Sequence, residues 1–180
     1  NLANDLHEQG KHAEAEELHR RALAGKEKAL GPEHRSTLIS VNNLANDLHE
    51  QGKHAEAEEL HRRALAGREK ALGPEHPSTL LSLNNLALDL HKQGKHAEAE
   101  ELDRRALAGE EKALGPEHPE TLTSVSNLAN DLHEQGKHAE AEELDRRALA
   151  GEEKALGPEH PETLVSVNNL ASNLREQGKH

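Results

Sequence analysis

The sequence of 180 residues contains no cysteine, methionine, phenylalanine, tryptophan or tyrosine. Without cysteine there is no disulfide, no thiolate zinc site and no thiol nucleophile. Only 33% of the residues are hydrophobic, so any core must be built from leucine, alanine and a few valines. No apolar run approaches the ~20 residues that span a membrane, and no N-terminal signal pattern is present. We therefore expect a soluble, cytoplasmic protein with no membrane partner.

Positive charge is also scarce. Lysine and arginine number 22 against 34 aspartates and glutamates, which gives a net charge of −12. Because acidic surfaces repel the phosphate backbone, the composition argues against a nucleic-acid partner.

What the sequence does contain is an internal repeat with a period of 42 residues. The first seven residues, from Asn1, return at Asn43 and Asn127, with one change at Asn85 and in a divergent form at Asn169. The first two copies match at 38 of 42 positions. We expect a single array over 1–180, with repeats 1–42, 43–84, 85–126 and 127–168 and a partial repeat 169–180.

Each repeat carries the signals of two helices, here called helix A and helix B. Helix A begins at Pro77, where a missing N–H costs nothing, and ends at Gly94, which suits a left-handed stop. Helix B follows at once and ends at Gly115. Apolar residues recur at helical spacing in both helices. They are Leu80, Leu83, Leu86, Ala87 and Leu90 in helix A, and Ala99, Leu102, Ala106, Leu107, Ala113 and Leu114 in helix B.

A single helix pair cannot bury both apolar stripes. Successive pairs must therefore stack, so that stability becomes a sum over repeats and their interfaces. Small residues at Ala45, Ala57 and Ala64 allow the helix axes to approach closely, which explains how a core without aromatics can close.

Five motifs recur at fixed offsets, and together they resemble a known family. They are Asn-Asn-Leu-Ala (42–45), Gln-Gly-Lys (51–53), Ala-Glu-Glu-Leu (57–60), Arg-Arg-Ala-Leu (62–65) and Leu-Gly-Pro-Glu-His-Pro (72–77). Over essentially the whole chain, these residues resemble the tetratricopeptide repeat in the long form found in kinesin light chains. The resemblance implies an all-α fold, a right-handed α-solenoid of stacked antiparallel helix pairs. It also implies that helix A lines the concave side and that peptides or proteins bind in the groove.

A second resemblance is to the C-terminal sensor arms of NACHT or NB-ARC signalling NTPases, which also contain near-identical long repeats. If the chain were such an arm, the nucleotide site would lie outside it.

The sequence departs from the family pattern in helix B and around the turn. Leu48, His54 and His61 stand where the family usually has tyrosine, and we expect His54 to be half-buried in this aromatic position. Gly67 stands where an aliphatic residue is usual, and glycine recurs there in every copy at a cost of about 1 kcal/mol each. Either a neighbouring helix needs a close approach, or the long helices tolerate the loss.

Variation between the copies marks a candidate binding surface on helix A. Columns 39, 42, 46 and 50 differ between copies, and their spacing keeps them within an arc of roughly 80° opposite the apolar stripe. Amide and imidazole groups in and beside this arc donate and accept hydrogen bonds, which suits an extended peptide. Solvent exposure alone would also permit such variation, and both interpretations stay open. The candidate groove residues are Asn42, Asn43, Asn46, His49, Asn84, Asn85, Leu88, His91, Ser126, Asn127, Asn130, His133 and Asn168.

Two helix B columns turn acidic toward the C-terminus. They contain His19, His61, Asp103 and Asp145, and Lys26, Arg68, Glu110 and Glu152. The four complete repeats carry net charges of −1, −2, −4 and −6, and the last 12 residues carry +1. This charge ramp would steer a basic partner to the later repeats, or it reflects drift on a solvated face, which we favour.

The 15 histidines form no recognisable metal motif. His7 and His12 are five residues apart across a glycine turn, whereas the zinc-protease motif needs a spacing of four on one helix. His12 and His19 would lie roughly 10 Å apart along a helix. We expect only chance binding of nickel or zinc at the turn, and no functional metal site.

Catalysis is not expected either. Serine, histidine and aspartate recur as equivalent copies rather than converging in one pocket, and no phosphate-binding loop occurs. The sequence therefore predicts neither an enzyme nor a cofactor.

Two functional classes remain open. The first is a protein- or peptide-binding scaffold that uses the helix A face within a larger signalling or adaptor protein. The second is a structural or model repeat array with no specific ligand in this segment. Near-identity of the copies favours the second class, and variation confined to the groove favours the first. Because Asn1 lies within helix A and no polar capping helix is visible, we expect an excerpt of a longer array whose ends stack head to tail.

Overall fold

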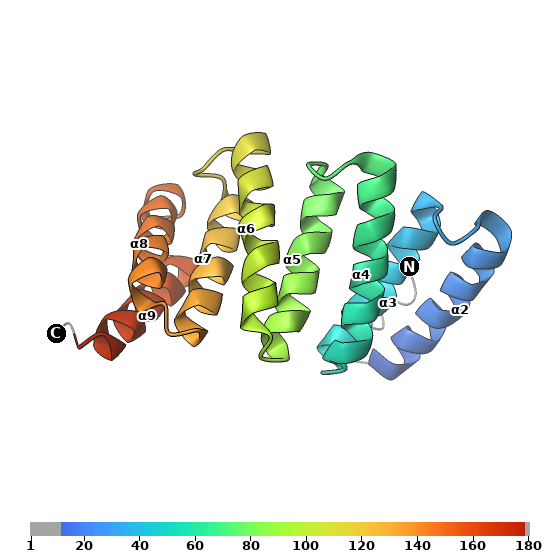
Figure 1. Ribbon diagram of the computed structural model, residues 1–180, viewed down its shortest axis with the longest axis horizontal. Coiled ribbons are helices and arrows are strands. Elements are labelled where there is room, and N and C mark those ends of the chain that lie inside the picture. The colour runs from blue at the N-terminus through green and yellow to red at the C-terminus, as the bar shows by residue number, and fades with distance from the viewer. Residues whose placement is uncertain (1–11, 179–180) are drawn as a thin grey trace. The chain divides into compact units, whose positions relative to one another are not determined.

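The computed structural model describes residues 12–178, with side chains from Glu14 onward, and every regular element in this part of the chain is an α-helix. The all-α prediction is thus confirmed. The chain divides into two compact units, Asn1–Gln93 and Gly94–His180, and each is described here by itself (Figure 1).

The N-terminal unit contains α2 (His12–Leu30), α3 (Arg35–Glu50), α4 (His54–Leu72) and α5 (Pro77–Lys92). In terms of the repeat, α2 and α4 are B helices and α3 and α5 are A helices. Each helix packs against the next one along the chain, so α3 contacts both α2 and α4 (Figure 1). The hairpin of one repeat is therefore covered by the next.

The C-terminal unit repeats this pattern with α6 (His96–Ala113), α7 (Pro119–Glu134), α8 (His138–Ala155) and α9 (Pro161–Glu176). Consecutive helices again pack together, and the two A helices α7 and α9 also touch. The predicted helix boundaries agree with these bounds to within two residues.

Helix A starts and ends as the sequence indicates, with one addition. Pro77 is the first residue of α5, and Gly94 closes the turn after it with φ of 73°. The residue before the proline also contributes, because His76 Nδ1 accepts a hydrogen bond from the Ser78 backbone N–H at 3.1 Å. His34, His118 and His160 cap their helices in the same way. Histidine is an unusual N-cap, so this role was not predicted.

The core of each unit is a seam of leucine, valine and alanine. Each cluster takes one leucine from a B helix, three residues from the next A helix and two alanines from the B helix that follows, at the same repeat columns in both units. The clusters are Leu23, Val41, Leu44, Leu48, Ala57 and Ala64 in the first unit, and Leu107, Val125, Leu128, Leu132, Ala141 and Ala148 in the second.

The predicted helix B stripe is correct except at its end. Ala99, Ala106 and Leu107 are buried, whereas Ala113 and Leu114 are exposed. These two residues lie where α6 ends and the chain turns into the loop before α7, beyond the seam.

The repeated helix B glycine is explained at two positions by close helix contact. A Cβ atom on Gly67 would lie 2.6 Å from Leu38 Cδ2, and one on Gly151 would lie 2.6 Å from Leu122 Cδ2. Both leucines are buried. The close-approach explanation therefore holds for these two glycines.

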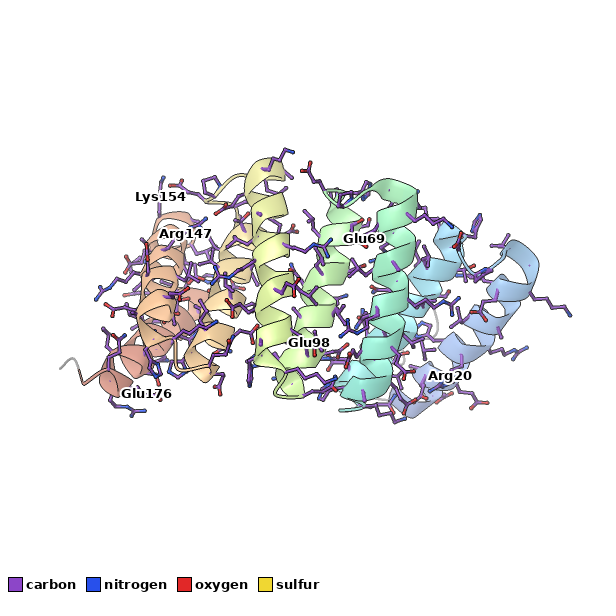
Figure 2. The ribbon with its side chains drawn as sticks, in the orientation of Figure 1. Arg20, Glu69, Glu98, Arg147, Lys154 and Glu176 are labelled. Atoms are coloured by element: carbon purple, nitrogen blue, oxygen red, sulfur yellow. The ribbon has the colours of Figure 1, made fainter. Side chains whose placement is uncertain are left out.

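A second contact between repeats is ionic. Glu16 on α2 accepts hydrogen bonds from Lys53 Nζ at 2.8 Å, from Arg20 Nε at 2.8 Å and from Gln51 Nε2 at 2.9 Å (Arg20 in Figure 2). The bond from Lys53 is the main reason why the pKa of Glu16 falls to about 2. This carboxylate thus ties helix B of one repeat to the turn of the next.

Glu100 occupies the equivalent place in the C-terminal unit. Burial by itself would raise the pKa of its carboxyl, but hydrogen bonds from Lys137, Gln135 and Arg104 outweigh that effect and lower the pKa to about 2. The ionic link is therefore a feature of the repeat rather than of one copy.

The glycine contacts predict opposite effects of one substitution at equivalent positions. Gly67→Ala should lower the free energy of unfolding by about 1–2 kcal/mol, because displacing buried Leu38 costs more than the gain in helix propensity. Gly25→Ala should raise it by roughly 1 kcal/mol, since no described atom lies within 4 Å of the new methyl group. Urea unfolding of both variants measures the difference, and stabilisation by Gly67→Ala would contradict the close-contact explanation.

Candidate functional site

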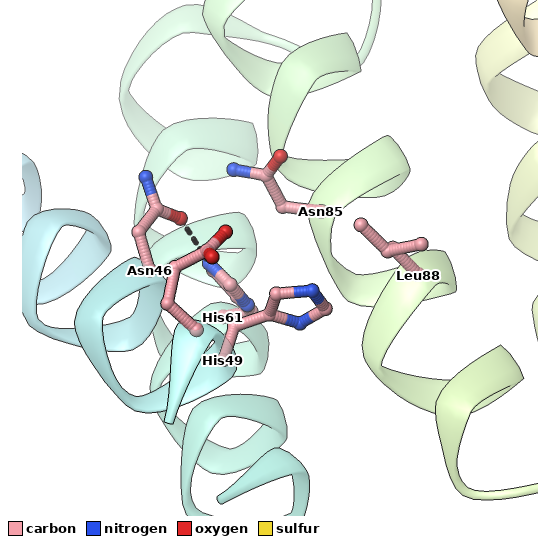
Figure 3. Close-up of a pocket in the computed structure, with 6 residues that line it drawn as sticks. Asn46, His49, His61, Asn85 and Leu88 are labelled. Atoms are coloured by element: carbon pink, nitrogen blue, oxygen red, sulfur yellow. Dashed lines mark hydrogen bonds between the residues drawn. The ribbon is translucent and has the colours of Figure 1, made fainter. Parts of the chain in front are cut away.

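The N-terminal unit contains a pocket of about 260 Å³ between its two A helices. Asn46 and His49 come from α3, Asn85 and Leu88 come from α5, and His61 comes from α4 (Figure 3). The imidazole of His61 is 1% exposed and lies hydrogen bonded to Asn46, with His61 Nε2 3.1 Å from Asn46 Oδ1 (Figure 3). We call this pocket, with the carboxylate of Glu50 at its edge, the first groove pocket.

The C-terminal unit contains a second groove pocket of about 210 Å³. Apart from Ala129, its lining residues are two repeats further along the chain than those of the first. They are Asn130, His133, Glu134, Asp145, Asn169 and Ser172. The same six columns therefore form a pocket in each unit, with His61 replaced by Asp145 and Leu88 replaced by Ser172.

Six of the predicted groove residues line these two pockets. They are Asn46, His49, Asn85, Leu88, Asn130 and His133. Six others lie along the A helices without lining either pocket, half-buried except for exposed Asn168. They are Asn43, Asn84, His91, Ser126, Asn127 and Asn168.

Asn42 is an exception among the predicted groove residues, because it does not face solvent. Its side chain is buried, and Asn42 Oδ1 accepts hydrogen bonds from Arg68 Nη1 at 3.3 Å and from Asn85 Nδ2 at 3.5 Å. Because helices α4 and α5 both reach this point, Asn42 belongs to the contact between repeats.

The two acidifying helix B columns are also buried, apart from half-buried Lys26, so their assignment to a solvated face was wrong. The side chains of the first column each meet a polar partner on the next A helix. His19 Nδ1 bonds to Asp47 Oδ2, and His61 Nδ1 donates to Asp89 Oδ2 at 2.6 Å. In the C-terminal unit, Asn173 Nδ2 donates to Asp145 Oδ2 at 3.2 Å.

These pairs carry a signal that was available in the sequence. The two residues of each pair lie 28 positions apart in the sequence. In the last pair, Asp145 stands where the first two pairs have histidine, and Asn173 stands where the other pairs have aspartate. The change keeps an acceptor opposite a donor. Comparison of the copies for compensating changes would have placed both columns inside the array.

The second acidifying column is internal as well. Lys26 Nζ donates to Ser40 Oγ at 2.7 Å, and Arg68 Nη1 donates to the Ser78 carbonyl at 3.0 Å. Arg68, Glu110 and Glu152 are buried, and burial lowers the pKa of Arg68. Much of the charge ramp therefore lies between helices, where it cannot steer a partner as a surface charge would.

In the third pair, two carboxyl groups face each other. Asp103 is 2% exposed, and its partner on α7 is Asp131. Burial raises the pKa of Asp103, and the charge of Asp131, a hydrogen bond with its carboxyl and the charge of Glu110 raise it further, to about 8. Burial also raises the pKa of Asp145, although the bond from Asn173 opposes this shift. Asp103 thus holds a proton at neutral pH that a free aspartic acid would have lost.

The turn between helices A and B brings histidines together, although their spacing seemed to exclude this. His49 and His54, five residues apart, lie near the carboxylate of Asp89, and one donor atom from each of the three lies within 4.8 Å of the others. His133, His138 and Glu176 form a similar group in the C-terminal unit. The earlier metal candidate at His7 and His12 involves side chains outside the described residues.

Comparisons with known proteins agree with this geometry. The family model described as "Tetratricopeptide repeat" matches residues 1–70, 37–111, 81–151 and 123–180. The chain belongs to the tetratricopeptide repeat family. Tetratricopeptide repeats are generally scaffolds for protein interactions, and no curated protein matches the chain significantly.

Solved structures place the chain among the long tetratricopeptide repeats. A Podosopora anserina protein with nearly identical TPR-like repeats, named for kinesin light chain, is 36% identical with a TM-score of 0.88, over 99% of this chain and 85% of its own. A point variant of that protein is also 36% identical, with a TM-score of 0.89 over 99% and 84%. BtubC (BKLC) from P. vanneervenii has a TM-score of 0.85 at 22% identity, over 99% and 71%, and supports the fold alone. The tetratricopeptide array is thus an all-α solenoid of the kinesin-light-chain-like type.

The helices of the tetratricopeptide array do not have the character of membrane-spanning segments in the part of the chain that the structure describes. Within residues 12–178, none of its helices combines the length and the apolar character needed to cross a bilayer.

The Asp103–Asp131 pair predicts a pH-dependent stability. The folded-state pKa of about 8 lies above the ordinary 3.8, so the folded chain holds a proton that the unfolded chain releases. Stability should therefore fall as pH rises from about 4 to about 8 and then level off. Asp103→Asn should remove most of this fall, because an amide can donate to Asp131 as Asn173 does to Asp145.

Urea unfolding midpoints at pH 5, 7 and 9 measure this effect. Glu101→Gln is the matched control, since it removes one carboxylate from the exposed face of the same helix. Parallel pH profiles for the parent chain and Asp103→Asn would show that the pair is not the titrating group.

Proposed function

We propose that the chain binds an extended peptide, or an extended segment of a protein, in the groove formed by its A helices. The observation that carries this proposal is the recurrence of one pocket, built from the same six columns, in both units. The general role of tetratricopeptide repeats as interaction scaffolds supports it. A place within a larger signalling or adaptor protein is part of the same proposal.

The constant residues of the two pockets suit a peptide backbone. Asn46 and Asn130 stand at one position, and Asn85 and Asn169 at another. Amide donors and acceptors match the N–H and C=O groups of an extended chain irrespective of its sequence. Because Asn46 Oδ1 is bonded to His61 and Asn85 Nδ2 donates to Asn42, a peptide would meet the Asn46 nitrogen and the Asn85 oxygen. In the first pocket, the Asn46 nitrogen points away from His61 (Figure 3).

The residues that differ suit discrimination between side chains. Leu88 is 41% exposed and gives the first pocket an apolar wall, whereas Ser172 gives the second a hydroxyl. An imidazole at the base of the first pocket is replaced by a carboxyl group at the base of the second. The first pocket therefore offers an apolar subsite and the second a polar one.

Removing both amides of one column should weaken peptide binding. We expect the double variant Asn85→Ala/Asn169→Ala to lose about fivefold or more in affinity for peptides that were selected on the parent chain from a displayed random library. Each lost hydrogen bond contributes about 0.5–1.5 kcal/mol, and 1.4 kcal/mol corresponds to tenfold. Fluorescence anisotropy with labelled peptides measures the change.

The matched control is Glu59→Gln/Glu143→Gln, which alters exposed residues at one column of the B helices in both units. It should bind as the parent does, and circular dichroism should be unchanged for both double variants. Equal affinity of the two double variants would place the binding surface elsewhere. If no peptide can be selected, the alternative of a structural array without a ligand is favoured.

The pocket walls predict an exchange of specificity. Leu88→Ser should weaken, by roughly tenfold, the binding of peptides that place an apolar side chain in the first pocket, because the lost contact contributes about 1.5–3 kcal/mol when fully buried. Ser172→Leu should increase the preference of the second pocket for apolar side chains. Peptide panels that vary one side chain at a time measure both effects, and unchanged preferences would count against these walls as subsites.

A further inference from the structure

The turn between α3 and α4 holds two imidazoles in a fixed relation. The backbone N–H of Gly52 donates to the His49 carbonyl at 2.8 Å, and that of Lys53 donates to the Leu48 carbonyl at 2.8 Å. This pair of bonds is the closure that a left-handed glycine makes at a helix end. As a result, the rings of His49 and His54 lie 4.9 Å apart in an edge-to-face arrangement.

A carboxylate from the next repeat completes the group. The side chain of Asp89 on α5 is fully buried, and its Oδ1 lies 2.6 Å from His49 Nδ1 and 3.7 Å from His54 Nδ1. In a tetrahedral zinc site with bonds of about 2.0–2.1 Å, neighbouring ligand atoms are about 3.3 Å apart. The observed separations lie on both sides of that value, so small side-chain rotations bring three ligand atoms onto one ion.

A residue outside the group orients the carboxylate. Asp89 Oδ2 accepts the hydrogen bond from His61 Nδ1, which leaves Oδ1 directed at the two histidines. Ligands in metal sites are commonly held by such outer hydrogen bonds. The buried Nδ1 of His54, in contrast, makes no hydrogen bond with any described residue. A cation bound here would coordinate both this buried imidazole nitrogen, which makes no such hydrogen bond, and the buried carboxylate beside it.

We propose that His49, His54 and Asp89 bind a divalent transition-metal ion of the zinc class. Two imidazoles and one carboxylate are ligands that zinc accepts, and three protein ligands leave a fourth position for water or for a side chain of a bound partner. Since His49 and His54 belong to one repeat and Asp89 to the next, the ion links two repeats.

The C-terminal unit offers a weaker version of the same group. Glu176 Oε2 lies 3.2 Å from His133 Nε2 and 3.9 Å from His138 Nδ1. Asn173 stands where the first site has Asp89, so the carboxylate comes from one turn later and is 44% exposed. A more mobile and more hydrated carboxylate is a poorer ligand, and we expect the first site to bind zinc more tightly.

Titration calorimetry of the whole chain with Zn²⁺ at pH 7.5, without peptide, tests the proposal. We expect the parent chain to bind Zn²⁺ with a dissociation constant in the micromolar range or below. His54→Gln should remove one tight equivalent or weaken it at least tenfold. Because the buried nitrogen of His54 makes no hydrogen bond, this variant should keep its helicity and its unfolding temperature. Affinity should fall at pH 5.5, where protons compete for the ligands.

The matched control is His34→Asn, which removes an exposed imidazole while keeping a good helix N-cap. It should bind Zn²⁺ as the parent does. Nuclear magnetic resonance of the parent provides a test without mutation, because the first equivalent of Zn²⁺ should shift the ring signals of His49 and His54. Three results would overturn the proposal: millimolar binding by the parent, full binding by His54→Gln, or equal losses in His54→Gln and His34→Asn.

Discussion

The packing of small residues between consecutive repeats is the constraint on which the rest of the structure depends. With no aromatic side chain available, the helices must come close enough for leucine and alanine to exclude water. Ala57 and Ala64 make this approach possible in one seam, and Ala141 and Ala148 do so in the other. Gly67 shows how tight the approach is, because even a methyl group there would meet Leu38. A rigid seam of this kind fixes the spacing of the A helices, and that spacing creates the groove pockets.

Polar pairs between a B helix and the next A helix lie beside the apolar seams, and these pairs differ from repeat to repeat. His61 donates to Asp89, Asp103 faces Asp131 and has a raised pKa, and Asp145 accepts a hydrogen bond from Asn173. Removing one partner of such a buried pair is costly because it leaves the other without a hydrogen bond. The Asp145–Asn173 pair shows such a paired change, between the fourth repeat and the partial repeat after it, whereas Asp103 faces an unchanged Asp131 and holds a proton instead.

The fold was predictable because its signals are local and repeated. Short-range rules predict the helix start at Pro77, the helix end at Gly94 and the stripe of leucine and alanine. Each of these signals recurs in the four copies. The inward position of His61 and Arg68 was not predictable by those rules, because helical spacing places a residue on a face but does not say how far a neighbouring helix covers that face. The contact between His49 and His54 was not predicted for a similar reason. Spacing along one helix does not give the distance between residues on two helices that are joined by a tight turn. Asn46 and Leu88 belong to a column that varies between copies, and they line the first groove pocket beside His49 and Asn85, whose columns do not vary among the complete copies.

Near-identity of the repeats favours a purely structural array, whereas the positions of the differences support a binding role. The seam columns of Leu44 and Ala57 are constant in every complete copy, and the column of Val41 changes only between valine and leucine. Columns 61 and 88, which form the base and wall of a groove pocket, change between the units. A spacer would gain nothing from differing at the bases of its pockets, where a substitution alters the hydrogen bonding to the neighbouring helix. His49 adds a further reason for differentiation, since it borders the groove pocket and also the proposed metal site. An ion bound there would restrain one wall of the groove, so occupancy of the turn and binding in the groove would be coupled through a single imidazole.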